Sequence, residues 1–250
     1  MEAYTDFADV YDTFMDETPY EEWCEFLIRI LEEYTVPKGL VLDLGCGTGT
    51  LTQMLSEAGY DMIGVDNSEQ MLAIAMEKRD ESGENILYLL QDMREFELYG
   101  TVAAVISVCD SLNYLLEEED LVQTFKLVNN YLDPKGIFIF DFNTVYKYRE
   151  VIGDATIAEN REDCSFIWEN YYHEEEEINE YDLTIFVRED GEHFRKFEEN
   201  HFQRGYRLEQ MKNALKQAGM EFVKALDADT HEEVNETSER IYCIARECGK

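Results

Sequence analysis

The 250-residue chain contains the stretch Leu40-Val41-Leu42-Asp43-Leu44-Gly45-Cys46-Gly47-Thr48-Gly49-Thr50, which decides its fold. The apolar residues 40–44 predict a short buried strand, the glycines predict a tight loop, and a helix then begins at Thr50 and ends at Gly59. Open α/β sheets bind ligands where their strands end, so this loop is a candidate binding site. The dinucleotide fingerprint requires glycine where Thr50 stands, so the NAD pattern is not met.

Strands and helices continue to alternate beyond this loop. Four further apolar runs predict strands, at residues 62–65, 86–90, 102–108 and 137–140. Periodic segments predict a helix that Ser68 caps and a second helix at residues 118–131, which ends at a turn over residues 133–136. Strands separated by helices in this way predict a parallel sheet that is buried on both faces.

Other patterns flank this alternation. Residues 18–35 predict an amphipathic helix with Thr18 as its cap. Three strand-like runs predict an antiparallel insertion, at residues 164–172, 178–188 and 193–202, with Asp190-Gly191 as a hairpin turn. A helix and two strands then return to the main sheet, at residues 208–218, 220–226 and 240–245.

These elements predict an α/β fold with a Rossmann-like doubly wound sheet that is mostly parallel and has an antiparallel last strand. The Rossmann-like cofactor-binding domain is expected in residues 38–150 and 205–250, and an inserted antiparallel β substrate subdomain in residues 151–204.

Composition and charge narrow the possible partners. The formal net charge of -35 favours a solvated surface and repels phosphate backbones and anionic lipids, so nucleic acid and membrane partners are disfavoured. The six cysteines form no Cys-x-x-Cys pair or other metal-ligand spacing, which predicts reduced thiols, a cytoplasmic location and no metal site. No export signal and no apolar run long enough to cross a bilayer is expected.

Acidic residues follow the next strands of the predicted sheet. Asp66 ends the run at residues 62–65, where a carboxylate can accept hydrogen bonds from both hydroxyls of a ribose. Asp92 ends the following strand and can accept from an adenine amino group, while Met93 packs on the ring. A nucleoside ligand is therefore expected.

These residues resemble the class I S-adenosylmethionine-dependent methyltransferases, in which a D-x-G-x-G-x-G loop and acidic residues after the second and third strands hold the cofactor. The resemblance implies S-adenosylmethionine as cofactor and S-adenosylhomocysteine as product, with the methionine part flanked by the loop and by residues 109–111. The cofactor-binding residues expected on this basis are Tyr11, Asp43, Gly45, Cys46, Gly47, Gly49, Asp66, Asn67, Met71, Asp92, Met93, Cys109, Asp110 and Ser111.

The N-terminal pattern Y-x-x-F-A-x-x-Y-D-x-x-M, from Tyr4 to Met15, and the insertion resemble a subset of bacterial small-molecule methyltransferases. These include uncharacterised members and amino-sugar N,N-dimethyltransferases. The resemblance implies that residues 1–37 form a helical lid and that Tyr11 contacts the methionine carboxylate. A half-buried packing role is the alternative for Tyr11.

Methyl transfer from a sulfonium requires alignment and exclusion of water, and a protonated acceptor also requires a base. Phe197, Glu199 and His201 alternate onto one face of the last inserted strand, and His201 is the candidate base. The candidate substrate-contacting residues are Asn113, Tyr114, Asn143, Trp168, Tyr172 and Glu199. A structural role is the alternative for His201, and core packing for the aromatic residues.

The sequence thus predicts transfer of a methyl group to a small-molecule acceptor, at nitrogen or oxygen. A methyltransferase acting on RNA is one alternative, and it requires a basic patch, for which residues 147–149, Arg204 and Arg207 are small candidates. A non-catalytic S-adenosylmethionine-binding module is the other. The sequence predicts no particular oligomeric state.

Overall fold

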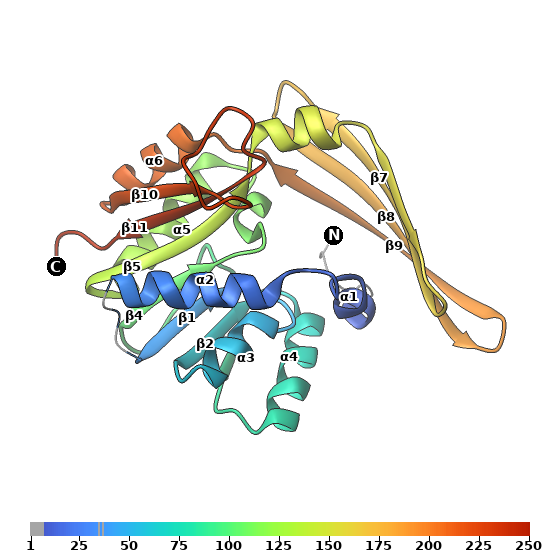
Figure 1. Ribbon diagram of the computed structural model, residues 1–250, viewed down its shortest axis with the longest axis horizontal. Helices are drawn as coiled ribbons and strands as arrows, with labels where there is room; N and C mark the ends of the chain where they lie inside the picture. Colours follow the sequence, from blue (N-terminus) through green and yellow to red (C-terminus); the bar gives the residue numbers. More distant parts are fainter. Residues whose placement is uncertain (1–7, 35, 37) are drawn as a thin grey trace.

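The computed structural model describes residues 8–34, 36 and 38–250. Residues 1–7, 35 and 37 lie outside the described residues. They include the beginning of the Tyr4 to Met15 pattern, the first residues of the expected lid, and Thr35, where the helix predicted at residues 18–35 was expected to end. The described chain forms two sheets, a large central one and a smaller one that extends away from it (Figure 1).

The central sheet carries the candidate site. Its strands are β1 (Leu40–Leu44), β2 (Asp61–Asp66), β3 (Leu87–Leu90), β4 (Val102–Ser107), β5 (Leu132–Asn143), β10 (Glu221–Asp227) and β11 (Arg240–Arg246). They lie in the order β10-β11-β5-β4-β1-β2-β3. Strands β1 to β5 pair in parallel, and β11 is antiparallel to both of its neighbours. The predicted mixed α/β fold is confirmed.

Strand β5 begins earlier than the sequence predicted. The expected turn at residues 133–136 is an irregularity within the strand, because the pairing with β4 shifts from Val102 opposite Leu132 to Ala104 opposite Ile137. Lys135 takes a left-handed φ of 67° at this irregularity. The helix before it, α5 (Glu118–Tyr131), has the predicted bounds, so only the boundary of the strand was wrong.

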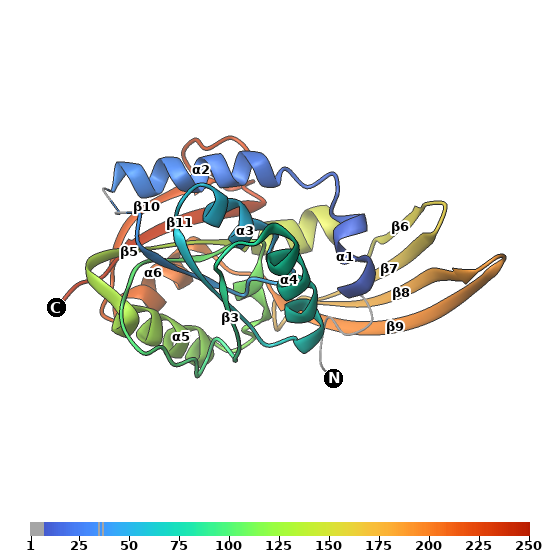
Figure 2. The ribbon, with the colours of Figure 1, turned by 90° about the horizontal axis from the view of Figure 1, so that it is seen from below.

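Helices cover both faces of the sheet (Figure 2). Helices α2 (Tyr20–Glu33), α3 (Thr50–Glu57) and α4 (Glu69–Ser82) pack on one face, and α5 and α6 (Leu208–Gln217) on the other. Ser68 caps α4 as predicted, because its hydroxyl accepts a 3.2 Å hydrogen bond from the Met71 N–H. Thr18 does not cap α2, since its hydroxyl donates to the Met15 sulfur instead.

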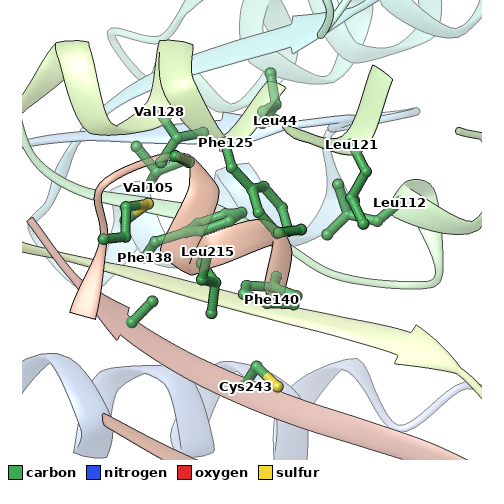
Figure 3. Packing of buried hydrophobic residues seen from close by; sticks show 14 of the residues in the cluster. Leu44, Val105, Leu112, Leu121, Phe125, Val128, Phe138, Phe140, Leu215 and Cys243 are labelled. Carbon is green, nitrogen blue, oxygen red and sulfur yellow. The ribbon is translucent and has the colours of Figure 1, made fainter. Parts of the chain in front are cut away.

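Aromatic side chains fill the core between β5 and helices α5 and α6 (Figure 3). Phe125, Phe138 and Phe140 are fully buried, and their ring centroids lie 4.6 to 5.4 Å apart. Burial of each ring contributes about 1.5–3 kcal/mol, so this layer holds α5 against β5, the strand that pairs with β4 beside the site.

The insertion follows β5 and forms the smaller, antiparallel sheet. It begins with η2, a π-helical segment (Lys147–Ile152), and continues with β6 (Thr156–Asn160), β7 (Cys164–His173), β8 (Ile178–Asp190) and β9 (His193–Arg204). The sequence predicted three of these strands and missed β6, which is short, exposed and polar at several positions. A turn at Gly191, with φ of 51°, joins β8 to β9 as expected.

The described N-terminal residues join the two sheets. Helix α1 (Ala8–Phe14) lies between the central domain and the insertion in both views (Figures 1 and 2). Its Val10 and Phe14 pack in a separate hydrophobic cluster with Leu183, Ile185 and Phe197 of the insertion.

Candidate active site

A pocket lies at the carboxyl ends of β1 to β4. Because the strand order is β4-β1-β2-β3, residues that follow β3 and β2 line one end of the pocket, and residues that follow β4 line the other. An elongated ligand can therefore extend across the glycine loop from one end to the other.

The glycine loop brings backbone to the floor of this pocket. Gly45, Gly47 and Gly49 all have left-handed φ values, of 82°, 53° and 73°. A Cβ at Gly45 would collide with Ser111, and one at Gly49 with Tyr88, whereas a Cβ at Gly47 would meet no protein atom within 4 Å. The loop therefore offers bare backbone beside open space, which fits the close approach of a polar amino-acid group.

Two carboxylates flank this loop. Asp66 accepts hydrogen bonds from the N–H groups of Gly47 at 2.8 Å and Ser68 at 2.9 Å, which oppose the rise of its pKa caused by burial. Asp43 is 2% exposed and accepts a 2.6 Å hydrogen bond from the Thr52 hydroxyl. Burial raises the pKa of Asp43 to about 7, and the nearby Asp66 adds to this rise.

The end of the pocket near β3 contains an ion pair. Asp92 Oδ2 lies 2.6 Å from Arg94 Nη2, and Asp92 Oδ1 accepts a hydrogen bond from the Arg94 backbone N–H. Arg94 holds the pKa of Asp92 below its usual value. Asp92 and Met93 line the pocket, as an adenine-binding pair must.

The loop after β4 lines the opposite end. Cys109 and Asp110 both have left-handed φ values, 65° and 54°. The buried Asp141 on β5 accepts hydrogen bonds from both of their N–H groups, at 3.1 and 2.8 Å. Arg240 on β11 lies 3.5 Å from Asp141 and opposes the rise of the Asp141 pKa that burial causes.

Helix α1 covers this end of the pocket. The Tyr11 hydroxyl lies 3.9 Å from Cys109 Sγ, and both residues line the pocket. Asp12 accepts a 2.7 Å hydrogen bond from Thr48 in the glycine loop and forms a 2.6 Å ion pair with Lys78 of α4. Helix α1 is thus attached to the loop that it covers.

The structure brings most of the predicted residues together. Those that line the pocket are Tyr11, Asp43, Gly45, Cys46, Gly47, Asp66, Asn67, Met71, Asp92, Met93, Cys109, Ser111 and Tyr114. Those that do not are Gly49, Asp110, Asn113, Asn143, Trp168, Tyr172, Glu199 and His201. The individual roles of all these residues stay predictions.

Several residues outside the lining support it. Gly49 precedes α3, and Asp110 accepts a 2.5 Å hydrogen bond from Gln203. Asn113 donates to the Asn143 carbonyl and accepts from the Asn143 N–H, both at 2.9 Å. Trp168 packs on Tyr181 within the insertion.

Sequence reasoning missed some residues of the pocket, namely Tyr20, Trp23, Gln91, Arg94 and Leu115. Trp23 lies in the amphipathic helix predicted at residues 18–35, and the structure shows that it contacts both the core and the pocket. Asp141 was also missed, although a carboxylate within the apolar run at residues 137–142 is a signal of a specific buried partner.

No helix among the described residues is long and apolar enough to cross a bilayer. No group of three or more His, Cys, Asp or Glu side chains in residues 8–34, 36 and 38–250 is arranged to hold a metal ion.

The fold and the pocket define an α/β protein of the Rossmann-like class with a site across its strand ends, and comparison with known proteins identifies the family. Residues 41–136 match the family model described as a methyltransferase domain. The chain is 38% identical over 244 residues to the Bacillus subtilis (strain 168) protein YqeM, whose name assigns it to the methyltransferases, and the match covers 97% of this chain and 96% of YqeM.

Solved structures agree. An S-adenosylmethionine-dependent methyltransferase from Clostridium acetobutylicum ATCC 824 superposes with a TM-score of 0.90 and 30% identity, covering 99% of this chain and 100% of that chain. DesVI of Streptomyces venezuelae has the same fold, with a TM-score of 0.78 at 21% identity over 96% of this chain and 98% of its own. The chain belongs to the methyltransferase family and is an S-adenosylmethionine-dependent methyltransferase.

Proposed function

We propose that this enzyme transfers the methyl group of S-adenosylmethionine to a nitrogen or oxygen atom of a small-molecule acceptor. One observation carries the proposal: α1 covers the β4 end of the pocket. Asp12 of α1 attaches this helix to Thr48 and Lys78. A covered end of this kind suits a compact acceptor better than a polymer.

The pocket also suggests how the cofactor is held. Asp66 would bind the ribose hydroxyls, Asp92 and Met93 the adenine, and the bare backbone at Gly47 the amino-acid end. Bound S-adenosylmethionine supplies an electrophilic methyl group. Burial raises the pKa of Cys109 to about 12, so this thiol is neutral and cannot compete for the methyl group as a thiolate.

A relative supports the acceptor class. A segment of 139 residues, 54% of this chain and 56% of the relative, is 30% identical to a dTDP-3-amino-3,4,6-trideoxy-alpha-D-glucopyranose N,N-dimethyltransferase from Streptomyces venezuelae. In our proposal, residues 1–37 form the lid and residues 151–204 form the subdomain that receives the acceptor. The formal charge of -35 disfavours RNA as that acceptor.

Methyl-labelled S-adenosylmethionine tests this proposal. The enzyme is incubated with the labelled cofactor and either a small-molecule extract or total RNA, and heat-denatured enzyme is the control. We expect label in the small-molecule fraction only. Label in RNA, or binding without transfer in every fraction, would contradict the proposal.

A further inference from the structure

A chain of three side chains runs from the β4 end of the pocket into the insertion. The Tyr114 hydroxyl lies 3.1 Å from His201 Nδ1, and His201 Nε2 lies 3.1 Å from Glu199 Oε2. His201 is 2% exposed and Glu199 is 6% exposed, whereas Tyr114 lines the pocket. Both ring nitrogens of His201 therefore have partners, and only the tyrosine faces the ligand space.

The carboxylate of Glu199 faces one ring nitrogen of His201, and the Tyr114 hydroxyl faces the other. A carboxylate accepts hydrogen bonds, so the relay requires a proton on Nε2 of His201, which lies 3.1 Å from Glu199 Oε2. The relay also requires that Nδ1 accept the Tyr114 hydroxyl proton, and the 3.1 Å separation of the two atoms allows this.

The surrounding side chains fix this arrangement. Tyr181 of β8 stacks on His201, with centroids 4.8 Å apart and planes within 7°, and its hydroxyl lies 2.9 Å from that of Tyr114. Trp168 of β7 packs on Tyr181, with ring centroids 4.9 Å apart. The ring of His201 is thus held in one orientation, as a relay requires.

The position of Tyr114 relates this chain to the acceptor. Tyr114 ends η1, the 3-10 helix (Ser111–Tyr114) that follows the loop of Cys109 and Asp110. Its hydroxyl reaches strands β8 and β9 of the insertion, which Figure 1 shows beside α1. Because Tyr114 lines the pocket and His201 does not, an acceptor in the pocket would contact the tyrosine rather than the imidazole.

We propose that Tyr114 is the catalytic residue that takes the proton from an acceptor whose attacking nitrogen arrives as an ammonium group, and that His201 and Glu199 are positioning residues behind it. The inference rests on the proposed function. It moves the contact with the acceptor from His201, the base expected from the sequence, to the tyrosine.

The proton balance is complete within these residues. The ammonium N–H bond breaks toward the Tyr114 oxygen as the O–H proton of Tyr114 moves to His201 Nδ1. The nitrogen keeps its electron pair and forms the bond to the methyl carbon, while sulfur keeps the pair of the broken S–CH3 bond. The positive charge reaches the imidazole, where the Glu199 carboxylate stabilises it.

The negative charge of the protein favours an ammonium group over a neutral hydroxyl as the attacking group of the acceptor. The chain has a formal charge of -35, which attracts cations. Glu199 is a buried carboxylate behind His201 and Tyr114, so it stabilises a positive charge that moves along the chain.

Three variants test the proposal on the acceptor that the labelling experiment identifies. Tyr114→Phe removes only the hydroxyl, Glu199→Gln removes the charge, and Tyr171→Phe is a matched control on the exposed part of β7. We expect kcat to fall by about 10²-fold or more for Tyr114→Phe and by at least about 10-fold for Glu199→Gln. The affinity of Glu199→Gln for S-adenosylhomocysteine should change by less than about twofold. A wild-type enzyme that labels no acceptor contradicts the proposed function, whereas unchanged kcat in Tyr114→Phe overturns only the relay.

Nitrogen NMR of the histidine rings gives a readout independent of activity. His201→Gln assigns the signals of His201 among the four histidines. We expect a protonated Nε2 with a downfield proton, which moves upfield in Glu199→Gln, and an unprotonated Nδ1 whose shift changes in Tyr114→Phe. A proton on Nδ1 in the wild type, or spectra that neither variant alters, would overturn the relay.

Discussion

Asp141→Asn tests whether one buried carboxylate supports the loop after β4. In the wild type, the Asp141 carboxylate accepts the N–H groups of Cys109 and Asp110 and neutralises Arg240. An amide keeps one accepting oxygen, presents an NH2 group to the other donor and leaves the guanidinium without its anion. Loss of one partner of a buried pair costs about 3–5 kcal/mol, so we expect the free energy of unfolding to fall by about that amount.

Urea unfolding of purified variants measures this loss. Asp80→Asn is the matched control, because Asp80 is exposed and its ion pair with Arg79 contributes about 0–1 kcal/mol. The affinity for S-adenosylhomocysteine should also fall in Asp141→Asn, since Cys109 lines the pocket. If Asp141→Asn unfolds within about 1 kcal/mol of the wild type, the support that we assign to Asp141 is refuted.

Two further variants test the glycine loop. The pKa of Asp43 is raised to about 7 from 3.8, so its contribution to stability is present below about pH 4 and is lost as the pH rises toward 7. Asp43→Asn lacks this titration, so its free energy of unfolding minus that of the wild type should rise with pH across this window, by up to about 4 kcal/mol. Urea unfolding at several pH values measures this difference, and a difference that does not change with pH would contradict the prediction. Gly49→Ala should lower the free energy of unfolding by about 1–3 kcal/mol more than the control Gly83→Ala. Both glycines have a left-handed φ, but only a Cβ at Gly49 would collide with Tyr88. Equal losses of unfolding free energy in the two variants would exclude this steric reason.

The sequence predicted the parts of the site that lie on short stretches of chain. The glycine loop, Asp66 and Asp92 each follow their strand directly, and parallel strands bring such residues to one edge of the sheet. The alternation of strands and helices also predicted the mostly parallel sheet, whereas the order of its strands was known only from the structure.

Contacts between distant segments could not be predicted. Asp141 supports Cys109 across 32 positions, and Tyr114 meets His201 across 87, through packing that no local pattern encodes. The alternation on β9 correctly placed Glu199 and His201 on one buried face, but it gave no information about which tyrosine would stand between His201 and the pocket.

Calorimetric titration with S-adenosylhomocysteine tests the central claim most directly, namely that the nucleoside binds across the ends of β1 to β4 and is held by Asp66. We predict saturable binding to the wild type and an affinity at least about tenfold lower for Asp66→Ala, because hydrogen bonds from the ribose to a carboxylate are lost. Equal affinities for the two proteins, or no binding to the folded wild type, would contradict the account.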